Sequence, residues 1–166
     1  MNFHRMTPRF AVLLLTVLTL FGCATTRASM PHAALLHVTG EEMLISAYGL
    51  MGTPYTPGGT SPSEGFDCSG FVRYVLLENG LSLPERSSDE MYRAGWQPVS
   101  REALKPGDLV FFQIGRQSRV NHVGIYVGDG QFIHAPARGG AVRVENLSLP
   151  YWQAAWSGAR RVAAGG

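Results

Sequence analysis

One cysteine and two histidines are spaced along this chain as the parts of a hydrolytic site would be. Cys68 lies in a glycine-bounded turn, residues 65–70, that leads directly into an apolar helical run. Free N–H groups and the dipole at a helix N-terminus favour negative charge, so a thiol there should lose its proton more easily and act as a nucleophile. His122 and His134 follow downstream and could supply a base and a group that orients it. The pattern predicts a cysteine hydrolase that needs no cofactor and no metal.

Each of these residues also has an ordinary structural explanation. A lone cysteine such as Cys68 is more often a small buried apolar residue than a nucleophile. His122 could be a core histidine at the start of a strand, and His134 a hydrogen-bonding residue at a strand edge. The three could instead hold zinc, although structural zinc sites usually contain closely spaced ligand pairs, which this sequence lacks. The context of Cys68 and the presence of both partners favour catalysis.

Three helices are predicted in the first half of the chain. Thr39 and Glu42 have the spacing of a capping box and open an apolar-periodic helix that ends near Gly52. A long loop rich in proline and glycine follows from residue 53 to residue 65. The second helix covers 68–77, and a second capping-box spacing, from Ser87 to Glu90, opens a short helix that stops at Gly95.

Strands are predicted in the second half, at residues 108–113, 122–127, 131–135, 142–144 and 159–162, with a short helical or turn segment at 149–156. The Gly128-Asp129-Gly130 turn makes 122–135 a hairpin. Since the start of one antiparallel strand lies beside the end of the next, the hairpin should bring His122 and His134 side by side. Helices followed by strands predict an α+β domain with the N-terminal helices packed on an antiparallel sheet.

The N-terminal segment has the pattern of a leader. Basic residues precede an apolar run, Phe10–Phe21, that is too short to span a bilayer as a mature helix. The following Gly22-Cys23 resembles the lipobox of bacterial lipoproteins, in which the cysteine is acylated and becomes the new N-terminus. This resemblance predicts a signal peptide at 1–22, a lipidated Cys23 with a tether to residue 38, and a domain at 39–163. The alternative is an ordinary secretory signal with an incidental cysteine.

The residue after Cys23 is Ala24, and the sorting rule of such lipoproteins then implies a lipid anchor on the periplasmic face of the outer membrane in a host with two membranes. The full chain has 14 Lys+Arg and 12 Asp+Glu, but Arg5 and Arg9 would leave with the signal peptide. A mature chain of balanced charge argues against nucleic acid as a partner. With Cys23 acylated, Cys68 would remain a free thiol in an oxidising compartment, where free thiols are unusual and catalysis is an obvious reason for one.

Four motifs in a fixed order resemble the NlpC-type cell-wall peptidases, a papain-like family. They are Phe66–Val72 around the cysteine, Lys105–Phe112, His122–Tyr126, and His134-Ala135. The resemblance covers about residues 39–162 and implies that Cys68 is the nucleophile, His122 the base, and His134 the polar residue that orients His122. It also implies that the backbone N–H of Cys68 helps to stabilise the oxyanion.

The same resemblance implies a substrate. Family members cleave peptidoglycan stem peptides, either at the γ-D-glutamyl–diaminopimelate bond or at the D-alanyl–diaminopimelate cross-link. Tyr55 would assist at the reaction centre, and Asp67 and Ser69 would bind the free amine of the stem peptide. Simpler alternatives remain open: Tyr55 could be a packing residue, Asp67 a helix cap, and Ser69 a residue of the first helical turn without a ligand.

Three positions depart from the family pattern and leave substrate preference open. Pro57 stands where many members carry tryptophan, Glu85 is an additional acidic residue, and Met91 replaces a common glutamine. All three are expected in loops that border the cleft. Two other functions remain possible from the sequence: a wall-binding lipoprotein without activity, and an amidase or acyltransferase that uses the same thioester on another substrate.

Overall fold

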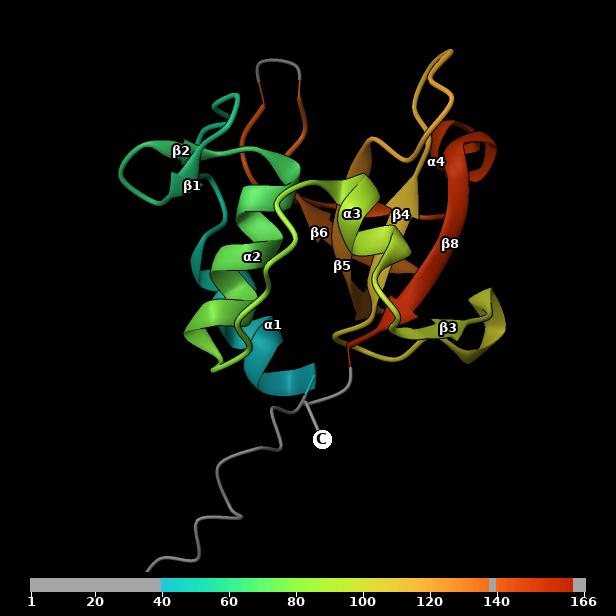
Figure 1. Cartoon of the computed structure of the whole chain (residues 1–166), viewed down its shortest axis with the longest axis horizontal. Helices are drawn as coiled ribbons and strands as arrows, with labels where there is room; N and C mark the ends of the chain where they lie inside the picture. Colours follow the sequence, from blue (N-terminus) through green and yellow to red (C-terminus); the bar gives the residue numbers. More distant parts are fainter. Residues whose placement is uncertain (1–39, 138–139, 163–166) are drawn as a thin grey trace, which may run out of the picture. The chain divides into compact units, whose positions relative to one another are not determined.

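The computed structural model describes residues 40–137 and 140–162 (Figure 1). The predicted signal peptide (1–22), Cys23, the tether to residue 38 and the Thr39 cap lie outside the described residues, as does residue 163 at the predicted domain boundary. Within the described ranges no helix has both the length and the apolar character needed to cross a membrane.

The three predicted helices of the first half are confirmed, and each begins where the sequence indicates. The helices are α1 (Gly40–Gly49), α2 (Cys68–Glu78), α3 (Ser88–Arg93) and α4 (Pro150–Ala155), with a 3-10 turn, η2, at Arg101–Ala103. Ser87 and Glu90 form the expected capping box of α3, in which each side chain accepts a backbone N–H of the other end. Met91, expected in a loop at the cleft, is instead fully buried in α3, because the helix turns its side chain into the core.

Six of the described strands form one antiparallel sheet in the order β3-β8-β4-β5-β6-β7. Their bounds are β3 (Gln97–Val99), β4 (Leu109–Phe112), β5 (His122–Gly128), β6 (Gln131–His134), β7 (Arg143–Asn146) and β8 (Trp156–Arg161). The predicted β5–β6 hairpin is confirmed, and its turn residue Asp129 has φ 49°, a left-handed conformation that aspartate tolerates.

Some elements differ from the prediction. Strand β7 lies at 143–146 rather than 142–144, and β8 begins at Trp156, three residues before the predicted start. Strand β3 and the short pair β1 (Thr60–Ser61) and β2 (Gly65–Phe66) were not expected. These short segments have no alternating pattern of their own, and they become strands because a neighbouring segment supplies their hydrogen bonds.

Alternate residues of the sheet face two separate cores. One, the α2-side core, consists of side chains from α1, α2, α3 and one face of the sheet, including Phe71, Met91 and Phe111. The other, the α4-side core, includes Phe112, Phe132 and Trp152 from the opposite face and α4. Figure 1 shows α1 beside α2, with α2 against β5 and β6 and α4 at the upper end of β8. The N-terminal helices therefore pack on the sheet as predicted, and α4 covers the second face.

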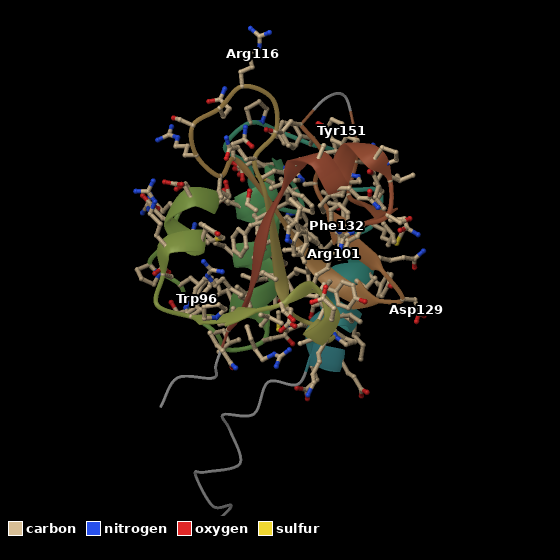
Figure 2. All side chains as sticks on the ribbon, turned by 90° about the vertical axis from the view of Figure 1, so that its right-hand side faces the viewer. Trp96, Arg101, Arg116, Asp129, Phe132 and Tyr151 are labelled. Atoms are coloured by element: carbon tan, nitrogen blue, oxygen red, sulfur yellow. The ribbon has the colours of Figure 1, made fainter. Side chains whose placement is uncertain are left out.

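The loop before β5 and the turn after it lie at opposite ends of the sheet. Figure 2 shows Arg116 at the tip of the 113–121 loop and Asp129 at the far end, in the β5–β6 turn. The loop is closed by Asn121, whose side chain accepts from the backbone N–H of Ile114 (2.7 Å) and donates to its carbonyl (2.9 Å). The start of β5, where His122 lies, is therefore held firmly in place.

Candidate active site

Cys68 is the first residue of α2, and its thiol lies against the start of β5. Its Sγ is 4.0 Å from the carbonyl oxygen of Asn121, and the backbone N–H of Val123 also points at the sulfur. The helix packs on β5 over several residues. The thiol is thus placed beside the backbone on both sides of His122, a position that the sequence alone could not assign.

The two histidines form the pair that the hairpin predicts. Nε2 of His122 lies 2.7 Å from Nδ1 of His134, and both side chains are almost completely buried. Gly124, between them on the same face, makes this contact possible: a Cβ at this position would lie 3.2 Å from Cβ of His134 and 2.7 Å from Cδ2 of Phe132. The absent side chain lets His134 lie across β5 and reach His122.

The expected easy ionisation of Cys68 is wrong for the site as it stands. Burial and the carboxylate of Asp67 raise the pKa of the Cys68 thiol to about 11. The N–H groups of Val123, Ser69 and Cys68 itself act in the opposite direction, as a helix N-terminus should, but they do not outweigh the other two effects. Cys68 is therefore a thiol at neutral pH.

Both histidines are neutral there as well. Burial, followed by the neighbouring His134, lowers the pKa of His122 to about 3, while Glu145 acts to raise it. Burial, followed by Arg143, lowers the pKa of His134 to about 3. An uncharged imidazole can accept a proton, so His122 is in the state that a general base requires.

Trp152 from α4 and Glu145 from β7 enclose the histidine pair. The Trp152 ring stacks on His122 at 5.5 Å and meets His134 edge-on at 5.1 Å. Its indole N–H donates to Oε2 of Glu145, and Oε1 of the same carboxylate lies 3.7 Å from Nε2 of His134. Strand alternation places Arg143 and Glu145 on the face of His134, but the predicted strand ended at residue 144 and so missed Glu145.

Asp67 and Ser69 have structural partners in the first turn of α2. Asp67 is the N-cap: its Oδ1 accepts from the N–H of Gly70 (2.6 Å) and its Oδ2 from that of Gly58 (3.1 Å). The Ser69 hydroxyl, almost fully buried, donates to Oδ1 of Asp67 at 3.0 Å. The capping alternative for Asp67 is thus confirmed, and Ser69 lies in the first turn, whereas binding of a substrate amine by either residue stays a prediction.

Tyr55 lies before α2 and packs against the α2-side core. The residue is half-buried, and its backbone N–H donates to the carbonyl of Gly140 (2.8 Å). Its backbone also forms an isolated parallel β-bridge with Phe66, just before α2. Burial raises the pKa of Tyr55, with further contributions from Cys68 and Asp67. The packing role of Tyr55 is therefore confirmed, and its role at the reaction centre stays a prediction.

A cavity of about 270 Å³ opens beside the histidine pair. It is lined by His122, Arg143, Glu145, Tyr151 and Trp152 together with Ile114, Pro136 and Ala137; Figure 2 shows Tyr151 at the same end of the molecule as the 113–121 loop. Within residues 40–137 and 140–162 no group of three or more His, Cys, Asp and Glu side chains is arranged to hold a metal ion. The arrangement consists of a thiol, a neutral base with a polar partner, and space for a substrate, which suits acyl transfer through a thioester.

Comparison with known proteins gives a consistent family relationship. A model described as the NlpC/P60 family matches residues 52–161. Murein DD-endopeptidase MepH of Escherichia coli (strain K12) is 44% identical over 113 residues, covering 68% of this chain and 42% of that protein. Probable endopeptidase NlpC of the same organism is 38% identical over 159 residues, covering 93% of this chain and 99% of that protein.

Solved structures agree with this relationship. The crystal structure of an NlpC/P60 family protein from Bacillus cereus ATCC 10987 has a TM-score of 0.68 and 36% identity, covering 74% of this chain and 40% of that chain. The chain spans less than half the length of MepH and nearly all of that of NlpC. The similarity therefore concerns the whole of the sheet and helices that hold Cys68 and the two histidines.

Proposed function

This chain belongs to the NlpC/P60 family, and from this premise we propose that it is a cysteine peptidase that hydrolyses an amide bond in peptidoglycan stem peptides. The observation that carries the proposal is the 2.7 Å contact between His122 and His134 beside a thiol at the N-terminus of α2. A relative named as a murein endopeptidase supports the substrate class.

In the proposed reaction, His122 acts first as a base and then as an acid. Sγ of Cys68 attacks the amide carbonyl while its proton passes to Nδ1 of His122, since Nε2 is engaged by His134. The carbonyl oxygen becomes an oxyanion that the N–H of Cys68 can stabilise. His122 then gives the proton to the departing amine nitrogen, the C–N bond breaks, and a thioester remains.

Water completes the proposed cycle. It attacks the thioester carbonyl while His122 accepts one of its protons, and the C–S bond breaks as the acid product leaves. The proton returns to the sulfur, so the site ends with a neutral thiol and a neutral imidazole. This start and end state agrees with the raised pKa of Cys68 and the lowered pKa of His122.

The proposal leaves two bonds to distinguish: the γ-D-glutamyl–diaminopimelate bond and the D-alanyl–diaminopimelate cross-link. In either case Tyr55 would contact the reacting groups, and Asp67 and Ser69 would meet the free amine of the stem peptide. The carboxylate of Asp67 suits an ammonium group, although it already accepts backbone N–H groups of Gly58 and Gly70.

The first experiment uses the full chain in detergent and its Cys68→Ala variant, each incubated with purified cross-linked muropeptides. We expect the wild type alone to release new products, with circular dichroism unchanged in the variant, and the product masses identify the bond. Equal product release by the Cys68→Ala protein would overturn the proposal. Tight binding of sacculi without products, from a folded wild type, would favour the wall-binding alternative instead.

The proposal extends to location: Cys23 is acylated, and the chain is anchored to the periplasmic face of the outer membrane. Expression of the wild type and a Cys23→Ser variant in a host with two membranes tests this. We expect the wild type in the outer-membrane fraction, with a mass increase from acyl chains, and the variant without that modification. An unmodified wild type found in the soluble fraction would contradict the anchor without affecting the proposed chemistry.

A further inference from the structure

We propose that Glu145 is a positioning residue that fixes the tautomers of His134 and His122 and so keeps Nδ1 of His122 free to accept the proton of Cys68. The inference rests on the proposed function for its purpose, but the geometry behind it concerns only the histidine pair and the carboxylate. No motif of the chain indicated Glu145, because it lies beyond the end of the strand that the sequence predicts.

The histidine contact leaves two proton arrangements. At 2.7 Å, Nε2 of His122 and Nδ1 of His134 share one proton, because both rings are neutral. If His122 carries it, Nδ1 of His122 is a free lone pair. If His134 carries it, Nδ1 of His122 holds the remaining proton and cannot act as a base. The choice between these tautomers decides whether the site can work.

The second nitrogen of His134 settles the choice. Its Nε2 is buried and has no hydrogen-bond partner among the described residues, and Oε1 of Glu145 lies 3.7 Å away. A lone pair on Nε2 would face a carboxylate and be repelled, whereas an N–H would be attracted. The proton of His134 therefore belongs on Nε2, its Nδ1 becomes an acceptor, and the shared proton belongs to His122.

Glu145 is itself held in place for this task. Arg143, on the same strand, donates to Oε1 from Nε at 2.6 Å and contacts it from Nη2 at 2.5 Å, and Trp152 on α4 donates to Oε2. These bonds orient the carboxylate toward His134. Among the described residues, the charged and titratable groups that face the pair are Glu145 and Arg143 from β7 and the Cys68 thiol from α2, with the uncharged Trp152 from α4.

Glu145 and Arg143 act on the pair with opposite signs. The carboxylate raises the pKa of His122, and the guanidinium lowers that of His134. Removal of Glu145 should therefore disfavour an imidazolium at the site, while removal of Arg143 should favour it.

The direct test is nitrogen NMR of the full chain labelled with ¹⁵N-histidine, using long-range proton–nitrogen correlations that distinguish Nδ1–H from Nε2–H. Signals are assigned by their loss in His122→Asn and His134→Asn variants. We expect Nε2–H tautomers for both rings in the wild type and a loss of this single arrangement in Glu145→Gln. Nδ1–H on either ring of the wild type, or unchanged tautomers in Glu145→Gln, would overturn the inference.

Alkylation of Cys68 by iodoacetamide gives a second, functional reading. The rate is measured against pH by mass spectrometry of the peptide that contains Cys68, so that Cys23 does not contribute. We expect Glu145→Gln to react at least about tenfold more slowly than the wild type at pH 7. Arg143→Gln should react at least as fast as the wild type. Glu78→Gln removes the same charge at an exposed position and, as the control, should react like the wild type. Equal slowing by Glu145→Gln and Arg143→Gln would indicate a merely structural role and contradict the inference.

Neither measurement needs peptidoglycan, so the two proposals can fail separately. A wild type that cleaves no muropeptide but shows the expected tautomers and alkylation rates refutes the proposed substrate and leaves the role of Glu145 standing. If the wild type and its Glu145→Gln variant cleave muropeptides equally well, the role of Glu145 is refuted and the proposed peptidase activity is not. If both hold, Glu145→Gln should lower kcat, because Glu145 acts on the base.

Discussion

At the residue scale, the position of Cys68 and its surroundings act on the thiol in opposite directions. The N-terminus of α2 directs N–H groups at the sulfur, yet burial and Asp67 keep its pKa near 11. Asp67 also has a structural role, because it caps the helix that begins with Cys68. The same side chain thus starts the helix and opposes ionisation of the first residue in it, which a motif alone does not reveal.

Replacement of Asp67 by asparagine separates these two roles. Asparagine caps helices about as well as aspartate, so Asp67→Asn should keep α2 while lowering the pKa of Cys68. We expect faster alkylation of Cys68 at neutral pH and a loss of about 1 kcal/mol in stability, since the bond from Gly58 N–H is given up. Ser69→Ala, which removes a bond to Asp67 but no charge, is the control. A rate equal to that of the wild type would refute the assigned effect of Asp67.

At the element scale, the β5–β6 hairpin determines how His122 and His134 lie relative to each other. The turn at 128–130 sets the register, and the register carries His134 over Gly124 to His122. The hairpin and the capped helices could be predicted because their signals are local: turn glycines, capping pairs and alternation. Strands β1, β2 and β3 could not be predicted, because these short segments have no alternating pattern of their own.

Gly124→Ala tests the role of this hairpin. The new methyl group would meet Cδ2 of Phe132 at 2.7 Å and the carbonyl oxygen of Ile133 at 2.9 Å, so His134 must move away from His122. We expect a loss of about 1–3 kcal/mol in stability and at least about a tenfold loss of peptidase activity. Gly49→Ala, at the end of α1 with open space around it, should leave activity intact. Full activity of Gly124→Ala would show that the close contact of the histidines is dispensable.

At the scale of the whole molecule, the site lies where the two cores meet. Cys68 packs with the α2-side core, and the rings of His122 and His134 contact Phe112, Phe132 and Trp152 of the α4-side core. The sequence predicted that His122 and His134 lie side by side, but not that Cys68 approaches from the α2-side core and the histidine rings from the α4-side core. Nor could it predict Glu145, because the register of β7 against β6 depends on the 135–142 connection, which has no periodic pattern.

Burial of two neutral histidines should make the fold sensitive to acid. In the unfolded chain each has a pKa near 6.5, and in the folded protein each lies near 3, so the unfolded state binds more protons between these values. The two histidines contribute fully to the free energy of unfolding above pH 6.5. This contribution is lost as the pH falls below 6.5, by up to about 2.7 kcal/mol per pH unit for the pair.

Urea unfolding at intervals from pH 7 to pH 5 measures this loss. The window excludes the range below the ordinary pKa of Glu90, whose carboxylate also has a lowered pKa. His134→Gln should show about half of the dependence on pH, since only one buried imidazole remains. A free energy of unfolding that does not change between pH 7 and pH 5 would contradict the assigned neutral state of the pair.

Because Trp152 stacks on His122, its fluorescence should report the charge of the His122 ring. Indole fluorescence is quenched by a nearby imidazolium much more than by a neutral imidazole, and Trp152 contacts both rings of the pair. When the proton of Cys68 moves to His122, the emission of this tryptophan should dim, and it should recover when the proton leaves. Stopped-flow fluorescence could therefore follow proton transfer on unlabelled substrate, with a Trp152→Phe variant identifying the signal.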